Sequence, residues 1–249
     1  MNTMSADHLI KQTEAFHAYW KETNHLFLNA CEGRISKTTF SRYLKNIQFL
    51  LHHTPLHLRM AIERSIELGD DRLTNFFQLK LAEEHGHEEW AKEDIATIAA
   101  KTLAPSMALH LDIVPGMLAL VKFNELVIKN HPALYLPYIL FAEYFVVIAA
   151  PEWIEILETR CAIPRQAASV LAKHAELDKF HVQDDIVEIG RFIEQRNDQA
   201  EQHLFVPMLE RAQALFWQFT HEVGSMDLVQ QPNPTAGGSL HVRSEPTLV

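Results

Sequence analysis

The sequence predicts an all-α fold, and three observations support this. Glycine is scarce, with 8 residues in 249. No stretch alternates apolar and polar residues as a half-buried strand does, and apolar residues recur at spacings of three and four. Because 47% of the residues are hydrophobic and no internal linker is apparent, we expect one helical domain over residues 1–225.

The helices of the amino-terminal half are placed by their end signals. The first is expected from about Ala6 to Ala30, ending at Glu32-Gly33. Ser36 can cap the second, which Pro55 should bend or restart. A third helix should begin after Gly69-Asp70 and continue to about Lys101.

Prolines and glycines set the remaining boundaries. Residues 103–114 are expected to be a connection, and Pro115 fits the first turn of a helix that runs to about Lys129. His131-Pro132 should restart the chain into the helix that carries LYLPYILFAEYFVVIAA. The later expectations are a short helix between Pro151 and Pro164, a helix from Arg165, a last helix ending near Gly224 and a disordered tail over 226–249.

Charge and cysteine content exclude several classes of protein. A formal charge of -10, with no basic cluster, argues against a nucleic-acid surface, so small molecules or proteins are the expected partners. Cys31 and Cys161 cannot build a disulfide framework, and the amino terminus has no apolar core of a signal peptide. We therefore expect a cytoplasmic protein that does not enter a membrane, and a homodimer is consistent with its apolar, acidic helices. The apolar stretch from Leu134 to Ala150 is expected to be a buried helix.

Candidate metal ligands occur on three predicted helices. His174, Asp178 and His181 share one helical stripe, since offsets of four and seven residues return to nearly the same direction. Glu84 and His87 are three apart and would be neighbours on a helix surface.

Two further acids bear on the same site. Glu83 is an alternative to Glu84 as the acid ligand paired with His87, because it lies four residues before that histidine. Glu143 is the one acid in its apolar helix, and a carboxylate is rarely buried unless it is paired or binds a metal. Together with the three helical-stripe residues these groups could bind a pair of metal ions, and carboxylate with imidazole suits iron or manganese better than structural zinc.

Simpler interpretations stay open beside this one. With 15 His in the chain, a pair spaced by seven is expected by chance. Glu143 could be a buried acid hydrogen-bonded to Tyr144 or to another neighbour. The cluster His52, His53 and His57 could reach a substrate, although a structural role is the simpler reading.

Part of the sequence resembles a known group of proteins. HLFLNACEGRISKTTFSRYLKNIQFL resembles the amino-terminal pattern of the thiaminase II and pyrroloquinoline-quinone synthase group, which has the haem-oxygenase-like fold. LAEEHGHEEW, the Glu143 helix and the His-x3-Asp-x2-His string resemble the haem-oxygenase-like diiron oxidases, and the whole resemblance covers about residues 14 to 222. It implies a haem-oxygenase-like bundle of about seven to eight helices. It also implies two Fe(II) ions per chain, which activate dioxygen to oxidise a small metabolite inside the bundle. The catalytic residues and iron ligands that it implies are Glu84, His87, Glu143, His174, Asp178 and His181.

The sequence also departs from these relatives. Some of them place an acid seven residues before the first ligand histidine, where this chain has Lys80. Thiaminase II enzymes use a cysteine nucleophile, and neither cysteine lies in a segment that carries a candidate ligand. Pro137 can kink the Glu143 helix and so alter the cavity beside it.

The substrate does not follow from the ligands, because relatives with similar ligands divide among hydroxylation, amine oxidation, desaturation and carbon–carbon cleavage. Two other functions stay open: a metal-free enzyme of the same fold that uses these side chains as general acids and bases, and a helical interaction protein. Aromatic residues near the ligand segments could line a substrate cavity or simply fill the core, and these are Phe123, Tyr135, Tyr138, Phe141, Tyr144 and Phe180.

Overall fold

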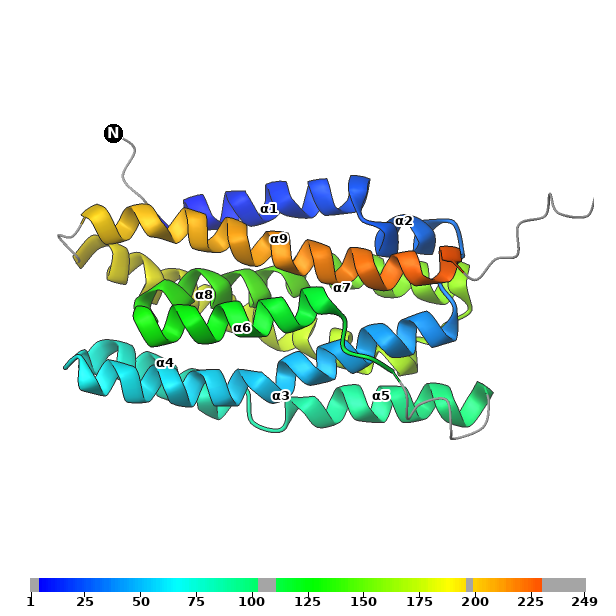
Figure 1. Ribbon diagram of the computed structural model, residues 1–249, viewed down its shortest axis with the longest axis horizontal. Helices are drawn as coiled ribbons and strands as arrows, with labels where there is room; N and C mark the ends of the chain where they lie inside the picture. The colour runs from blue at the N-terminus through cyan, green and yellow to red at the C-terminus, as the bar shows by residue number, and fades with distance from the viewer. Residues whose placement is uncertain (1–4, 103–110, 196–198, 230–249) are drawn as a thin grey trace, which may run out of the picture.

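The computed structural model describes residues 5–102, 111–195 and 199–229. Within these ranges every regular element is a helix and there is no strand, so the predicted all-α fold is confirmed (Figure 1). The α-helices are α1 (Ala6–Thr23), α2 (His25–Cys31), α3 (Lys37–Glu67), α4 (Asp71–Glu83), α5 (His87–Thr102), α6 (Pro115–Asn130), α7 (Leu136–Cys161), α8 (Ser169–Gln195) and α9 (Gln199–Val229). Two short 3-10 helices, η2 (Pro132–Tyr135) and η3 (Arg165–Ala168), precede α7 and α8.

Helix α7 is the centre of the bundle. It packs on α8, α1, α9 and α2, and its apolar side chains point in several directions because it has neighbours on several sides. In Figure 1 helices α1 and α9 lie along one side of it, and α3, α4 and α5 lie on the other. The segment Pro132–Cys161 is long and apolar enough to cross a membrane by length and composition. However, 72% of its most apolar window is buried inside the protein, as expected for a core helix.

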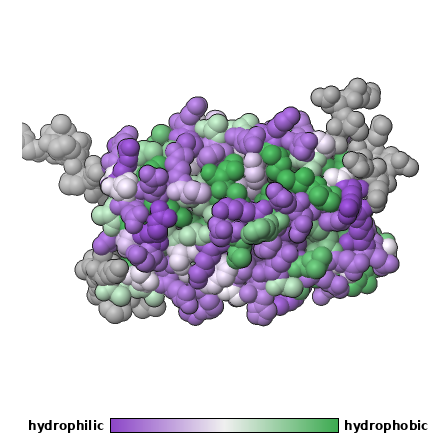
Figure 2. Space-filling view, turned by 180° about the vertical axis from the view of Figure 1, so that it is seen from behind, coloured by the Kyte–Doolittle hydropathy of each residue, from purple (hydrophilic) through white to green (hydrophobic). Residues whose placement is uncertain are grey.

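The outer surface is mostly polar. Figure 2 shows hydrophilic side chains over much of one face, with apolar side chains appearing between them in several places. Single exposed apolar residues such as Leu79 and Phe180 occur among the described residues, and scattered ones are normal on a soluble fold.

The predicted first helix is divided in two. Asn24 leaves the helical conformation, and its side chain accepts a hydrogen bond from the Leu26 amide at 3.0 Å. The same side chain donates to the carbonyl oxygen of Trp217 at 3.0 Å, which attaches the break to α9. Long-range hydrogen bonds of this kind decide the boundary, and they are not visible in the local sequence pattern.

The predicted third helix is also divided. Helix α4 ends at Glu83, and α5 begins at His87, with Gly86 between them in the left-handed conformation at φ 85°. The prediction that Glu84 and His87 share one helix surface is therefore wrong: the turn at Gly86 separates them. Their closeness in space comes from the turn.

Several proline predictions need correction, while others are confirmed. Pro55 and Pro151 lie inside α3 and α7, and no separate helix lies between Pro151 and Pro164, since α7 continues to Cys161. Ser36 caps α3, and Pro115 lies in the first turn of α6, as predicted.

The ends of the chain fit the predictions in part. Helix α9 extends past Gly224 to Val229, so the first residues of the expected tail are helical. The rest of that tail, 230–249, and most of the expected 103–114 connection lie outside the described residues.

Candidate metal site

Three buried side chains from different elements meet in the bundle interior, where α4 gives way to α5. Glu84 follows α4 directly, His87 begins α5, and His174 comes from α8. One potential ligand atom of each lies within 4.8 Å of the others, and the two imidazole rings meet edge to face with centroids 4.9 Å apart. We call these residues the first group.

One hydrogen bond fixes the His174 ring and leaves its other nitrogen without a partner. Its Nδ1 lies 2.8 Å from the carbonyl oxygen of Val170, so Nδ1 carries the hydrogen and donates it. Its Nε2 is therefore unprotonated in the neutral ring, and this buried atom has no hydrogen-bond partner. Burial lowers the pKa of His174, although the nearby Glu84 opposes this, so the neutral, ligating form is favoured.

Trp90 holds the two imidazoles in place. Its ring stacks on His87 at a centroid distance of 4.0 Å and meets His174 edge to face at 5.3 Å. Nδ1 of His87 lies 3.3 Å from the Glu84 carboxylate, without the geometry of a hydrogen bond. Burial would raise the pKa of Glu84, but the two histidines beside it hold that pKa below its ordinary value, which keeps the carboxylate charged.

A second group lies close by and consists of Glu83, Glu143 and His181, whose potential ligand atoms also lie within 4.8 Å of one another. An ammonium group is already in contact with two of them. Nζ of Lys80 donates to both Glu143 oxygens, at 3.0 and 3.2 Å, and lies 3.1 Å from Glu83. The same nitrogen forms an ion pair with Asp185 at 2.7 Å.

Carboxylates outnumber cations around Lys80. Burial and the nearby Asp185 raise the pKa of Glu143 well above its ordinary value, although Lys80 opposes this. Burial likewise raises the pKa of Asp185. Burial and the charge of Glu84 raise the pKa of Asp178 to about 8. So much buried acid is stable only with bound protons or with further cations.

Asp178 is the predicted site residue that belongs to neither group. Its Oδ1 lies 3.3 Å from Nδ1 of His181, so the two residues contact each other on α8. The structure thus brings the six predicted residues into one region but divides them, with Glu84, His87 and His174 in the first group and Glu143 and His181 in the second. Glu83 and Glu84, which the sequence left as alternatives, each join a different group.

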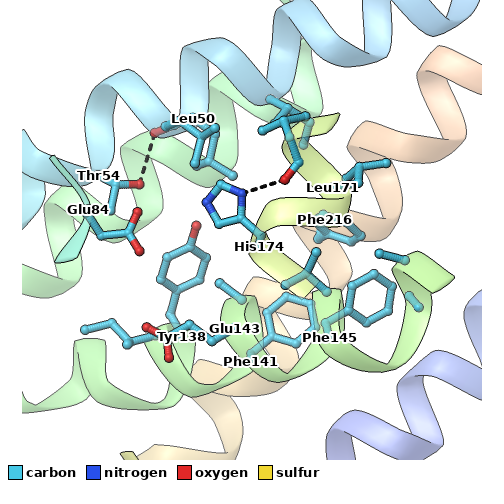
Figure 3. A pocket seen from close by; sticks show the side chains of 18 of the residues that line it. Leu50, Thr54, Glu84, Tyr138, Phe141, Glu143, Phe145, Leu171, His174 and Phe216 are labelled. Atoms are coloured by element: carbon cyan, nitrogen blue, oxygen red, sulfur yellow. Dashed lines mark hydrogen bonds between the residues drawn. The ribbon is translucent and has the colours of Figure 1, made fainter. Parts of the chain in front are cut away.

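An apolar pocket reaches the first group. It encloses a cavity of about 150 Å³, and Figure 3 shows Glu84 and His174 facing it together with the Tyr138 hydroxyl. The polar end is formed mainly by Lys80, Glu84, Glu143 and His174. The wall is formed mainly by aromatic and aliphatic side chains, among them Trp20, Tyr43, Phe141, Phe145, Trp153 and Phe216.

Only some of the aromatic candidates line this pocket. Tyr135, Tyr138 and Phe141 do so, whereas Phe180 is 71% exposed on the surface of α8. The Tyr144 hydroxyl donates to Glu14 at 2.8 Å and so does not pair with Glu143. Phe123 is absent from the lining.

The histidine cluster on α3 and the two cysteines lie outside the lining as well. His57 is buried against the Tyr135 ring at 6.1 Å, and burial lowers its pKa to about 4. Cys161 directs its thiol at the carbonyl oxygen of Ala30, and neither it nor Cys31 borders the pocket. A cysteine nucleophile in this pocket has no support.

Two residues of the site were not recognised from the sequence. In the sequence Lys80 stands out only as a departure from relatives, and Asp185 is not among the predicted ligands. Asp185 lies seven residues after Asp178, so its helical stripe is the same and this spacing could have identified it. Lys80 carried no such signal for its long-range contacts, because Glu143 and Asp185 come from α7 and α8, and only Glu83 is a neighbour on its own helix.

The fold defined by these helices is the haem-oxygenase-like fold. A domain of unknown function from Shewanella denitrificans, described as having a heme oxygenase-like fold, matches with a TM-score of 0.78 at 16% identity. The match covers 92% of this chain and 95% of that one. A TenA homolog from Pseudomonas syringae pv. tomato matches with a TM-score of 0.64 at 14% identity, over 90% of this chain and 96% of that one.

At such low identities these structures establish the fold and not the activity. No protein-family model matches the chain, and no curated protein matches it.

Proposed function

We propose that this protein is an iron-dependent oxidoreductase that uses dioxygen to oxidise a small, largely apolar molecule held in the pocket. One observation carries the proposal. The unprotonated, buried Nε2 of His174 has no partner and lies beside Glu84 and His87, where an apolar pocket ends. An orphaned buried nitrogen of this kind is costly unless something binds it.

The donor atoms fit a redox metal. Two imidazoles and a carboxylate are typical ligands of non-haem iron, and a bound iron would supply the redox chemistry that dioxygen needs. Glu84, His87 and His174 would hold an ion, with Trp90 fixing the ring orientations. Binding of two iron ions, which the resemblance implies, requires that the second group also binds an ion.

The pocket contributes substrate binding and the exclusion of water. Its wall of aromatic and aliphatic side chains would take up an apolar body by the hydrophobic effect. The Tyr138 hydroxyl, which faces the same space in Figure 3, is a donor that can orient a polar end of the substrate. The chain's own part is to align the substrate beside the metal.

A metal-free enzyme is the second candidate, and the ammonium of Lys80 favours it. This charged group lines the same pocket as Glu84 and His174, so the pocket already contains a cation that can bind an anionic substrate group and a base. The fold alone fits this candidate as well as the first, because a TenA homolog shares it.

We further propose that the protein works in the cytoplasm on a small molecule, as a monomer or homodimer, without contact to nucleic acid or membrane. The acidic charge and the burial of the most apolar helix support this.

Anaerobic loading with Fe(II), followed by admission of oxygen, tests the two candidates. The proposal expects bound iron, a transient visible absorption and oxygen uptake by the wild type, and loss of all three in His174→Ala. His8→Ala, which removes an exposed histidine, is the matched control and should behave as the wild type. Binding of less than about 0.3 iron per chain in the wild type would contradict the proposal and favour metal-free catalysis.

A further inference from the structure

We infer that this chain binds a single divalent metal ion, at Glu84, His87 and His174, and that the ammonium of Lys80 takes the place of a second ion. The inference rests on the metal site of the proposed function. It concerns how many ions that site holds, and it replaces the expectation of two.

The contacts of Lys80 are those of a cation bound in a site. Lys80 is 4% exposed, and its nitrogen lies within 3.2 Å of carboxylate oxygens from three different side chains, Glu143, Asp185 and Glu83. These acids come from α7, α8 and α4, so the ammonium joins three helices as a structural ion would.

A second metal ion would compete for the same oxygens. Protein carboxylates bind divalent transition metals at about 2.0 to 2.2 Å. An ion on Glu143 would therefore lie within about 5 Å of an ammonium nitrogen that is 3.0 Å from the same oxygen. The site is buried, so water does little to screen the repulsion between these cations.

Moving the Lys80 ammonium away from its carboxylates would cost free energy. Its side chain is 5% exposed, its nitrogen lies 5.9 Å from the centre of the Phe76 ring, and the pocket that it borders is lined mainly by apolar side chains. Leaving would place the ammonium among apolar groups or leave the carboxylates of Glu143 and Asp185 without a cation. The first group differs in that no described lysine or arginine forms an ion pair with its members.

The consequence for the chemistry is a site with one metal ion, flanked by a fixed positive charge that also borders the pocket. Glu143 and Asp185 then act as positioning residues for Lys80. His181 of the second group is left to pair with Asp178.

Mn²⁺ is a suitable probe, because its count per chain and its paramagnetic resonance spectrum are independent of any activity. We expect about one Mn²⁺ per wild-type chain, with the six-line spectrum of an isolated ion, and almost none in His174→Ala. In Lys80→Met, whose unbranched side chain is one atom shorter and has no charge, we expect about two ions and the spectrum of a coupled pair. Lys92→Met removes an exposed lysine and should behave as the wild type.

Each outcome can be assigned. A coupled pair or about two ions in the wild type would overturn this inference and leave the proposed function intact. One Mn²⁺ per chain in a folded Lys80→Met variant would also overturn the inference, since the ammonium would then not be what excludes a second ion. No metal in the wild type would overturn both, and one ion without oxygen uptake would overturn only the proposed function. If Lys80→Met does not fold, the wild-type spectrum alone decides the question.

Discussion

Replacing Lys80 with Met should strongly destabilise the metal-free protein at neutral pH. At an effective dielectric constant of about 20, a pair of unit charges 2.7 Å apart, the distance between Lys80 and Asp185, attracts by roughly 6 kcal/mol before the cost of desolvation. Removing one partner of a buried pair typically costs about 3 to 5 kcal/mol, because the remaining charge is left uncompensated. For a chain of this size that cost lowers Tm by about 6 to 20 °C.

The loss of stability caused by Lys80→Met should depend on pH in a defined direction. The pKa values of Glu143 and Asp185 are already raised, and without Lys80 both should rise further. Protons taken up at low pH then replace the missing cation, so the destabilisation should shrink from pH 7 to pH 5. Thermal unfolding followed by circular dichroism, with a chelator present, measures it. Lys92→Met, an exposed lysine, should leave Tm unchanged. A Tm for Lys80→Met within about 2 °C of the wild type would refute the buried ion pairs.

Three further predictions concern the acids, the packing and the pocket. Because the pKa of Asp178 is raised to about 8, the folded protein holds a proton that the unfolded chain releases, and stability should fall as pH rises from about 4 to 8. Asp178→Asn should remove this fall in stability and raise the Tm of the metal-free protein at pH 8 but not at pH 4. If the Tm of the variant changes with pH in parallel with that of the wild type, the raised pKa of Asp178 is contradicted. Gly224→Ala should cost at least about 2 kcal/mol in urea unfolding, because a Cβ there would overlap the backbone of Leu26, whereas Gly190→Ala has room and should be neutral or slightly stabilising. Ala149→Leu, which narrows the pocket, should weaken binding of an apolar dye such as aminoanthracene at least several-fold without changing the metal content. If the variant binds the dye as tightly as the wild type, the dye binds outside this pocket.

Helical periodicity was sufficient to predict the fold class and one side of the site. The spacing of His174, Asp178 and His181 placed three polar groups on one stripe, and α8 carries all three as a single helix. Scarce glycine and the absence of alternation predicted a helical protein without strands in its described parts.

Predictions failed where long-range contacts decide the structure. The break at Asn24 depends on α9, more than 190 residues away in the chain. The turn at Gly86 separates Glu84 from His87, although their spacing fits one helix equally well. Two of the three ion pairs of Lys80 depend on other helices, and the i,i+3 spacing to Glu83 alone does not indicate that the lysine is buried among acids.

Crystals of the wild type grown anaerobically with Fe(II) test the central claim most directly, through anomalous diffraction on both sides of the iron absorption edge. We predict one strong anomalous peak per chain, from an iron ion bound by Glu84, His87 and Nε2 of His174. The Lys80 nitrogen should still contact Glu143. The absence of a peak among these three side chains, in crystals that contain iron, would contradict the account.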